Sequence, residues 1–257
     1  MPIWQFLSAL LVGGAVHIFD DETVRNPAQL LDLTEAHQIT ILEVVPSLLR
    51  YMLDELSARS TERPDFTALR WLLLTGEALP PHLCQEWFNH YPNIPQMNAY
   101  GPTECSDDVT HHAIYEPLPS NVVTVPIGRA VANMRLYILN DQLQPTPIGV
   151  PGELYVGGIG VGRGYLNDPE RTATAFMSDP FVPGPEARFY KTGNLVRYRS
   201  DGAIEFLGRL DHQIKIRGHR IELGEIETVL GKHPEVRQTL VIAHEKVAND
   251  YTLVAYL

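Results

Sequence analysis

The sequence lacks the patterns of a disulfide scaffold or a structural zinc site. Its 257 residues include two cysteines, Cys84 and Cys105, which form no Cys-x-x-Cys pair and have no histidine at a metal-ligand spacing. Small disulfide-rich domains and structural zinc sites need several such ligands at close spacing. We therefore expect a protein of the reducing cytoplasm without structural zinc.

An excess of positive charge and a long hydrophobic run are also missing. The formal net charge is −11, from 20 Lys and Arg against 31 Asp and Glu. This balance argues against nucleic acid and anionic membranes as partners, because phosphates would repel the chain except at local basic clusters. The apolar run at residues 6–19 contains two glycines and a histidine and is too short to span a bilayer, and we identify no targeting segment.

Hydrophobic spacing divides the chain into three predicted regions. Residues 1–122 alternate helical and strand patterns, which is typical of a layered α/β domain. Residues 123–210 contain short strands with many glycines and prolines, which predicts a small β-barrel-like subdomain. Residues 211–257 predict part of a small α+β unit. We expect helices over 28–37, 47–59, 80–91 and 222–233, and strands over 39–45, 71–74, 238–244 and 251–257, with another strand leading into 98–100 and a turn at 249–250.

The segment Gly208–Glu227 predicts a strand, a turn and the start of a helix. Ile214 and Ile216 alternate with polar and basic residues, and Gly218 ends the alternation before an acidic helix begins. From composition alone, the four cations of this segment are typical of a solvated basic strand edge. Alternatively, they present positive charge to an anionic ligand.

A second segment, Asn98–Glu104, follows a predicted strand and combines several polar groups in a tight turn. Tyr100 can stack on an adenine ring, the Thr103 hydroxyl can bind a phosphate, and the Glu104 carboxylate can bind the Mg²⁺ that accompanies a nucleotide. The simpler interpretation is a turn in which Thr103 caps a helix.

Both segments closely resemble motifs of the adenylate-forming enzymes, specifically the amino-acid adenylation domains of nonribosomal peptide synthetases. The resemblance implies that fold and an enzyme that uses ATP and Mg²⁺ to activate an amino acid. It implies that Thr103, Glu104 and Arg209 carry the catalytic chemistry and that Glu104 is the metal ligand. The nucleotide site implied in this way consists of Gly76, Glu77, Ala78, Asn98, Ala99, Tyr100, Gly101, Asn194 and Arg209.

Asn194 departs from the pattern of the family. The segment Tyr190–Leu195 resembles the ribose-binding motif, in which an aspartate stands at this position. An amide offers one acceptor oxygen and no charge, so it binds two ribose hydroxyls less well than a carboxylate. A plain turn residue after Gly193 is the alternative interpretation of Asn194.

The resemblance also implies a moving part and a second partner. Asp211 corresponds to the hinge about which a C-terminal lid rotates, so that one site serves both adenylate formation and thioester formation. The partner in the second step would be the phosphopantetheine thiol of a peptidyl carrier domain, approached by Gly218 and its neighbours. Neighbouring synthetase domains are further expected partners.

Aligning the chain to the family predicts a substrate pocket with an acidic lining. The predicted lining is Trp4, Glu43, Leu73, Thr75, Ala99, Asp107 and Asp108. Its three carboxylates suit a cationic side chain such as lysine, arginine or ornithine, because a buried negative charge is costly unless a ligand neutralises it. Alternatively, Asp107 and Asp108 cap local backbone or face solvent.

Three other polar patterns have simpler explanations. The glycine-rich segment Gly157–Tyr165 lacks the Gly-Lys-Ser/Thr ending of a phosphate-binding loop, so we expect it to be structural. The acidic run 20–22 is typical of a solvated loop. His111 and His112 lack further ligands and predict a structural or exposed pair.

The family pattern extends beyond both ends of this sequence. No phosphate loop ending in Pro-Lys-Gly precedes Trp4, and no lysine of the C-terminal type follows Leu257. We therefore expect part of an adenylation domain that is inefficient or inactive by itself. Two other functions remain open: an acyl- or aryl-CoA ligase of the same superfamily, and a catalytically inactive remnant or interaction module.

Overall fold

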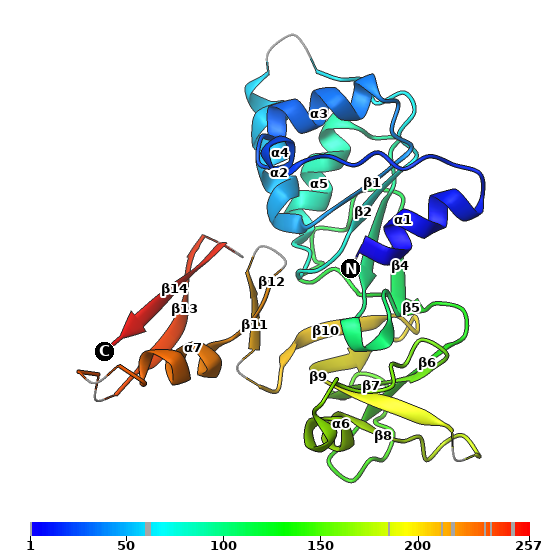
Figure 1. Ribbon diagram of the computed structural model, residues 1–257. Coiled ribbons are helices and arrows are strands. Elements are labelled where there is room, and N and C mark those ends of the chain that lie inside the picture. Colours follow the sequence, from blue (N-terminus) through cyan, green and yellow to red (C-terminus); the bar gives the residue numbers. More distant parts are fainter. Residues whose placement is uncertain are drawn as a thin grey trace.

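The computed structural model describes residues 2–257, except 60–62, 185, 212, 217, 218, 234, 237, 248 and 249. For residues 2–4, 213–215, 220, 245–247, 250 and 251 only the backbone is described. The chain forms an α/β part with its helices gathered along one sheet, a second sheet below it, and a small C-terminal unit beside both (Figure 1).

The first sheet joins parallel and antiparallel strands in the order β1-β2-β3-β4-β5. Strands β1 to β3 are parallel, and β4 and β5 are antiparallel to their neighbours. The strands are β1 (Ile41–Val44), β2 (Trp71–Leu74), β3 (Gln96–Tyr100), β4 (Thr110–Ile114) and β5 (Arg129–Ala130). The helices of this part are α1 (Pro2–Leu11), α2 (Asp21–Val24), α3 (Pro27–Ala36), α4 (Pro46–Ala58) and α5 (Pro81–His90).

Helical spacing of apolar residues explains how α4 and α5 pack beside this sheet. Leu49, Met52, Leu53 and Leu56 recur at intervals of three and four residues on α4 and are fully buried. They belong to one hydrophobic core with Trp87 of α5 and with Leu72 and Leu74 of β2. Proline stands in the first turn of α3, α4 and α5, where its missing N–H costs nothing.

The predicted elements of this part lie within two residues of the observed ones, and β2 matches its predicted bounds. The acidic run 20–22 is a correction, because Asp21 begins α2 and is not in a loop. Asp20 caps this helix, since the backbone N–H of Thr23 donates to Asp20 Oδ1 over 2.8 Å. The same hydrogen bond lowers the pKa of Asp20.

The second sheet is antiparallel and has the order β10-β9-β7-β6, with β8 paired to β9. Its strands are β6 (Met134–Leu139), β7 (Gly152–Gly158), β8 (Phe176–Ser178), β9 (Arg188–Tyr198) and β10 (Ile204–Arg209). Helix α6 (Pro169–Ala175) precedes β8 and is capped by Asp168. The core of this sheet includes Cys105 and Val109, which follow β3, so the two sheets share a hydrophobic junction.

A β-bulge at the end of the second sheet fixes the partner of Arg209. Strand β10 pairs regularly with β9 up to Phe206, and the register then shifts so that Gly208 lies opposite Leu195. Arg209 consequently lies opposite Asn194. Cross-strand neighbours of this kind have side chains on one face and within contact distance.

The C-terminal unit contains two hairpins and a helix. Strands β11 (Gln213–Ile216) and β12 (His219–Glu222) pair antiparallel, as do β13 (Leu240–Val247) and β14 (Asp250–Tyr256). Helix α7 (Leu223–Leu230) ends earlier than predicted, where Gly231 follows it. Residues 217 and 218, between β11 and β12, and residue 249 of the predicted turn lie outside the described residues.

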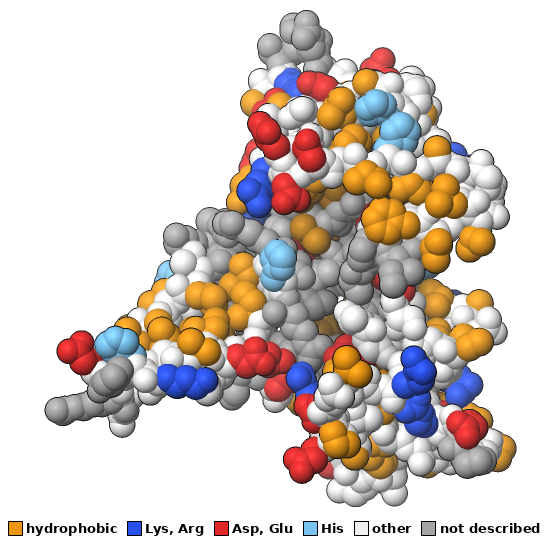
Figure 2. Space-filling view, viewed as in Figure 1, with side chains coloured by type: hydrophobic (Ala, Val, Ile, Leu, Met, Phe, Trp, Pro, Cys, Tyr) orange, Lys and Arg blue, Asp and Glu red, His pale blue; other side chains and the backbone are white. Residues whose placement is uncertain are grey.

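The surface of the α/β part carries an apolar patch over α1 and the segment after it (Figure 2). Leu10, Leu11 and Val12 are 58%, 82% and 84% exposed there. None of the described helices combines the length and hydrophobicity needed to cross a bilayer.

Candidate functional site

The turn after β3 is built by close backbone contact. Gly101 lies against the chain at Asp107 and Asp108, and a Cβ at this position would lie 1.9 Å from the carbonyl oxygen of Asp107. The backbone N–H of Val109 donates to the carbonyl of Tyr100 over 2.7 Å. Thr103 and Glu104 then form a short 3₁₀ turn, η1 (Thr103–Cys105), without a side-chain cap from Pro102. The backbone contact at Gly101 thus closes the turn.

Glu104 is held by the glycine-rich loop that precedes α6. Tyr165 donates its hydroxyl to Glu104 Oε1 over 2.7 Å, and the backbone N–H of Gly162 donates to the Glu104 carbonyl over 2.8 Å. Ser106 adds a hydrogen bond to the carbonyl of Gly160. The loop therefore holds the turn that carries Glu104, and it reaches the side chain of Glu104 through Tyr165.

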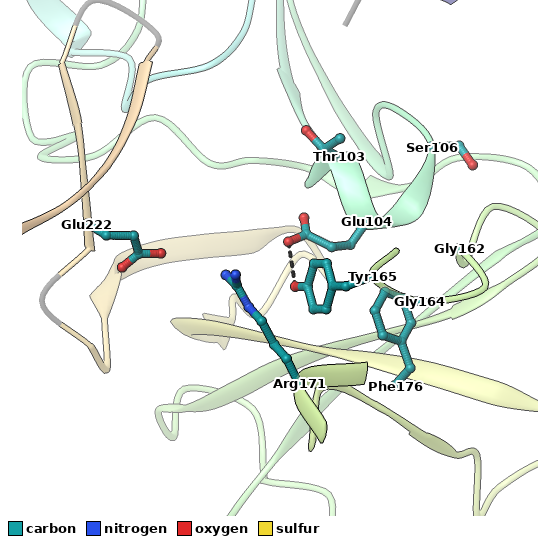
Figure 3. A pocket seen from close by; sticks show the side chains of 9 residues that line it. All are labelled: Thr103, Glu104, Ser106, Gly162, Gly164, Tyr165, Arg171, Phe176 and Glu222. Atoms are coloured by element: carbon teal, nitrogen blue, oxygen red, sulfur yellow. Dashed lines mark hydrogen bonds between the residues drawn. The ribbon is translucent and has the colours of Figure 1, made fainter. Parts of the chain in front are cut away.

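These residues line an open pocket of about 490 Å³ between the two sheets and the C-terminal unit (Figure 3). Glu104 and Tyr165 lie at its centre, and Glu222 faces them from β12. The lining consists of Thr103, Glu104, Ser106, Gly162, Gly164, Tyr165, Arg171, Phe176 and Glu222. The pocket therefore presents both hydroxyl and charged groups to a ligand.

The residues of this pocket fit a Mg²⁺ ion that arrives with a nucleotide. Among the described residues, no group of three or more His, Cys, Asp and Glu is arranged to hold a metal. Mg²⁺ is usually held by one or two carboxylates together with substrate phosphates and water, and not by an all-protein cage. The Glu104 carboxylate beside the Thr103 hydroxyl supplies a donor set of this kind.

A hydrogen-bonded chain of side chains connects Tyr100 to the predicted hinge. The amide nitrogen of Asn194 donates to the Tyr100 hydroxyl, and Arg209 Nη1 donates to Asn194 Oδ1 over 3.0 Å. Arg209 also donates from Nε and Nη2 to the two carboxylate oxygens of Asp211, both over 2.6 Å. Burial raises the pKa of Tyr100, so its hydroxyl stays protonated. The structure thus brings together four of the predicted residues.

Strand alternation explains an acidic cluster beside this chain, formed by Glu43, Asp107 and Asp108. Glu43 lies opposite Leu73, and Leu73 opposite Met97, in the parallel register. Residues two positions apart share a face of the sheet, so Thr75 and Ala99 project on the same side. Asp108 accepts a hydrogen bond from the Thr75 hydroxyl at 3.5 Å and contacts His111 Nε2 at 3.3 Å.

Burial and the crowding of carboxylates change the acidity of this cluster. Burial raises the pKa of Asp107 to about 7, and the negative charges of Asp108 and Glu43 add to the effect. Burial likewise raises the pKa of Glu43, with a smaller contribution from Asp108. The three carboxylates therefore lie close together, and their role as the lining of a substrate pocket stays a prediction.

Other predicted residues have structural partners. The buried side chain of Asn98 donates to the carbonyl of Pro126 over 2.8 Å, and Glu77 accepts hydrogen bonds from the backbone and hydroxyl of Ser47 at the start of α4. Gly76 turns the chain there with a φ of +87°. The side chain of Trp4 lies outside the described part of the structure. The ligand contacts of these residues stay predictions.

The sequence interpretation missed Tyr165, Arg171, Phe176 and Glu222 as pocket residues. Each lies far along the chain from Glu104, and none belongs to a recognisable motif for phosphate or metal. A signal was nevertheless present, because four glycines in 157–162 permit close approach of backbones, and a Cβ at Gly162 would lie 2.9 Å from the Glu104 carbonyl.

Comparison with known proteins identifies relatives over the whole chain. Residues 1–166 match the family model described as AMP-binding enzyme. Malpinin synthetase from Mortierella alpina is 42% identical over 257 residues, which cover 99% of this chain and 3% of that protein. Tyrocidine synthase 1 from Brevibacillus parabrevis is 40% identical over 99% of this chain and 22% of its own length. The chain therefore spans a small part of the length of these relatives.

Solved structures show the same fold. The Vibrio cholerae adenylation domain AlmE, in complex with glycyl-adenosine-5′-phosphate, superposes with a TM-score of 0.83 at 30% identity, over 98% of this chain and 47% of that one. An artificially fused adenylation-PCP di-domain from Klebsiella oxytoca gives 0.78 at 28% identity, over 96% and 44%. The predicted fold class is confirmed, and the chain spans less than half of either structure.

Proposed function

The chain belongs to the AMP-binding enzyme family, and we propose that it is part of an adenylation domain that activates an amino acid with ATP. The carboxylate of the amino acid attacks the α-phosphorus of ATP, a new oxygen–phosphorus bond forms, and pyrophosphate leaves with the electron pair of the broken bond. The product is an aminoacyl-adenylate. No protein nucleophile takes part, so binding, orientation and charge stabilisation carry the reaction.

One observation carries this proposal: side chains from three distant segments form a continuous site. Asn194 and Arg209 connect through hydrogen bonds to Tyr100, and Tyr100 lies in the turn that places Thr103 and Glu104 in the pocket. In the proposed complex Tyr100 stacks on adenine and Asn194 lies beside the ribose. The bound metal would neutralise phosphate charge.

Each polar group has a distinct task in the proposed reaction. The Thr103 hydroxyl donates a hydrogen bond to the α-phosphate. The Glu104 carboxylate, which Tyr165 orients through a hydrogen bond, would hold Mg²⁺. Arg209 has its guanidinium oriented by Asn194 and Asp211 and supplies positive charge near the ribose and phosphates. The turn at Gly76, Glu77 and Ala78 forms a wall for the other face of adenine.

The second step would be transfer of the aminoacyl group to the phosphopantetheine thiol of a carrier domain, releasing AMP. The solved adenylation-PCP di-domain of a related protein supports a carrier domain as the partner. Asp211 lies between the second sheet and the C-terminal unit, where a hinge would let that unit rotate.

The acidic cluster supports an amino acid with a cationic side chain as the substrate. Glu43, Asp107 and Asp108 lie together on the substrate side of the sheet, and a lysine, ornithine or arginine side chain would neutralise them. The test is ATP–pyrophosphate exchange by the full protein that contains this chain, comparing lysine, ornithine and arginine with leucine and phenylalanine. Equal rates with leucine would contradict the cationic preference.

Nucleotide binding tests the proposed function as a whole. We expect the chain to bind AMP and MgATP in calorimetry, and the full protein to exchange pyrophosphate only when an amino acid is present. Formation of a CoA thioester in place of carrier loading would favour the acyl-CoA ligase alternative. Absence of nucleotide binding by the chain and by the full protein would favour an inactive remnant.

A further inference from the structure

Arg171 is a cation of the pocket to which the proposed reaction assigns no task. It lies in the first turn of α6, where its backbone N–H donates to Asp168 Oδ1 over 3.0 Å. Its guanidinium carbon lies 4.6 Å from the centre of the Tyr165 ring. The aromatic ring supports the guanidinium from one side and leaves its edge directed into the pocket.

The guanidinium of Arg171 has no carboxylate partner among the described residues, although Glu104 and Glu222 line the same pocket. A guanidinium presents planar N–H donors that match phosphate oxygens in pairs. A pocket that combines a metal-binding carboxylate with such an arginine suits a ligand that carries both a divalent cation and several negative oxygens.

The position of Arg171 indicates which phosphates it would contact. Figure 3 shows Thr103 and Arg171 on opposite sides of Glu104. In the proposed complex Thr103 contacts the α-phosphate, and the Glu104 carboxylate would hold the Mg²⁺ that accompanies the nucleotide. A group on the far side of Glu104 from Thr103 would therefore meet the β- and γ-phosphates.

We propose that Arg171 binds the β- and γ-phosphates of ATP, and hence the pyrophosphate product, with Tyr165 as the platform that orients it. The inference rests on the proposed function. It adds a residue that strengthens the binding of ATP relative to AMP, because AMP lacks the phosphates that Arg171 would contact. Tyr165 then has two tasks, since its hydroxyl orients Glu104 and its ring supports Arg171.

The test measures the affinities of AMP, MgATP and magnesium pyrophosphate for the chain by calorimetry. Arg171→Ala is expected to weaken MgATP and pyrophosphate binding about tenfold and to leave AMP binding unchanged, because only the outer phosphates lose a charged hydrogen bond. Arg171→Lys should restore part of the loss. The matched control is Arg70→Ala, which removes the same charge from an exposed position beside β2 and should change no affinity.

Two variants of Tyr165 separate its tasks. Tyr165→Phe keeps the ring and removes the hydroxyl, so a further Arg171→Ala change should still cost about tenfold for MgATP. Tyr165→Leu removes the platform, and the same further change should then cost less. Equal losses in both backgrounds would contradict the role of the ring.

The outcomes distinguish this inference from the proposed function. If the wild-type chain binds AMP and MgATP but Arg171→Ala leaves their affinity ratio unchanged, the role of Arg171 is wrong and the proposed function stands. If neither the wild-type chain nor the full protein that contains it binds either nucleotide, both are overturned. Thermal unfolding of each variant checks that a loss of binding is not a loss of folding.

Discussion

The two charged regions beside β3 are balanced in different ways. In the hydrogen-bonded chain that runs from Tyr100 to Asp211, the Arg209 guanidinium is matched by the Asp211 carboxylate and the Asn194 amide oxygen. In the acidic cluster, Glu43, Asp107 and Asp108 lie together, and the His111 imidazole contacts Asp108 at 3.3 Å. In the first region, the cation is paired with an anion of the protein. In the second, three carboxylates lie together with no lysine or arginine among the described residues in contact with them.

This difference suggests two tasks: the first region would position the nucleotide, and the second would recognise the amino acid. A network whose donors and acceptors already match holds its geometry before any ligand binds, which suits groups that must orient a nucleotide. Crowded carboxylates respond instead by a raised pKa, as at Asp107, and a cationic ligand would reverse that shift. Substitutions that affect one region and spare the other therefore test this distinction.

The largest effect is expected from Gly101→Ala, which disturbs both regions together. The added methyl would lie 1.9 Å from the Asp107 carbonyl oxygen, so the turn must open. We expect a loss of stability on the order of 3 kcal/mol in chemical denaturation, with loss of nucleotide binding. The control is Gly224→Ala on α7, where no atom lies within 4 Å and stability should stay equal or rise. Normal stability of Gly101→Ala would refute the packing described for this turn.

Glu104→Gln is expected to act on the pocket alone. The amide keeps the size of the side chain and can still accept a hydrogen bond from Tyr165, but it loses the charge that a Mg²⁺ ligand needs. We expect MgATP affinity to fall on the order of tenfold or more while metal-free AMP affinity is retained. Titrations with and without Mg²⁺ measure this. An equal loss for both nucleotides would show that Glu104 does not act through a metal.

Protonation of Asp107 should control the binding of a cationic amino acid. Its pKa of about 7 means that the carboxyl is largely protonated below pH 7 and ionised above it. Binding of lysine or ornithine by the full protein is therefore expected to strengthen as the pH rises through 7, as measured by calorimetry from pH 6 to pH 8. Asp107→Asn should flatten this profile. A profile unchanged by the substitution would mean that another group titrates.

The same shift predicts how stability depends on pH. The folded pKa of Asp107 is raised above the ordinary value of 3.8, so the folded state holds the proton more tightly. Its stabilising contribution is complete below pH 3.8 and is lost as the pH rises to about 7. Asp107→Asn should remove this part of the pH dependence in denaturation curves.

The smallest effect is expected from Asn194→Asp, which alters the balanced region. A carboxylate restores the acceptor oxygens of the family pattern and places a second negative group against Arg209. We expect AMP to bind about threefold tighter and 2′,3′-dideoxy-AMP to be unaffected, in parallel titrations. Asn140→Asp, on a distant turn, is the control. An equal gain in affinity for both nucleotides would mean that the effect comes from the overall charge and not from contact with the ribose hydroxyls.

Local patterns predicted most of the fold. The leucine spacing of α4 and the apolar residues of β2 depend on neighbours in the sequence, and both elements were placed within a residue. The bulge after Phe206 and the short helix at Asp21 were not predicted, because each depends on a few hydrogen bonds that a hydrophobic pattern does not record.

The candidate site was predictable where one segment carries the chemistry. Tyr100, Thr103 and Glu104 lie in one turn, so their residue types, together with the resemblance to the family motif, predicted a nucleotide site. Tyr165 and Arg171 escaped prediction because their proximity to Glu104 results from the shared core of the two sheets. Residue type gives no signal for a contact that depends on such packing.

The bulge in β10 shows that one unpaired residue can decide which side chains meet. If the regular pairing continued past Phe206, Gly208 would lie opposite Asn194, and the arginine would fall one position further along β9. Because the pairing skips Leu207, Arg209 lies opposite Asn194 instead. A relative that lacks one residue here could therefore keep the same arginine–amide pair on a regular strand. Comparisons among relatives should align this strand by its cross-strand partners and not only by its amino-acid sequence.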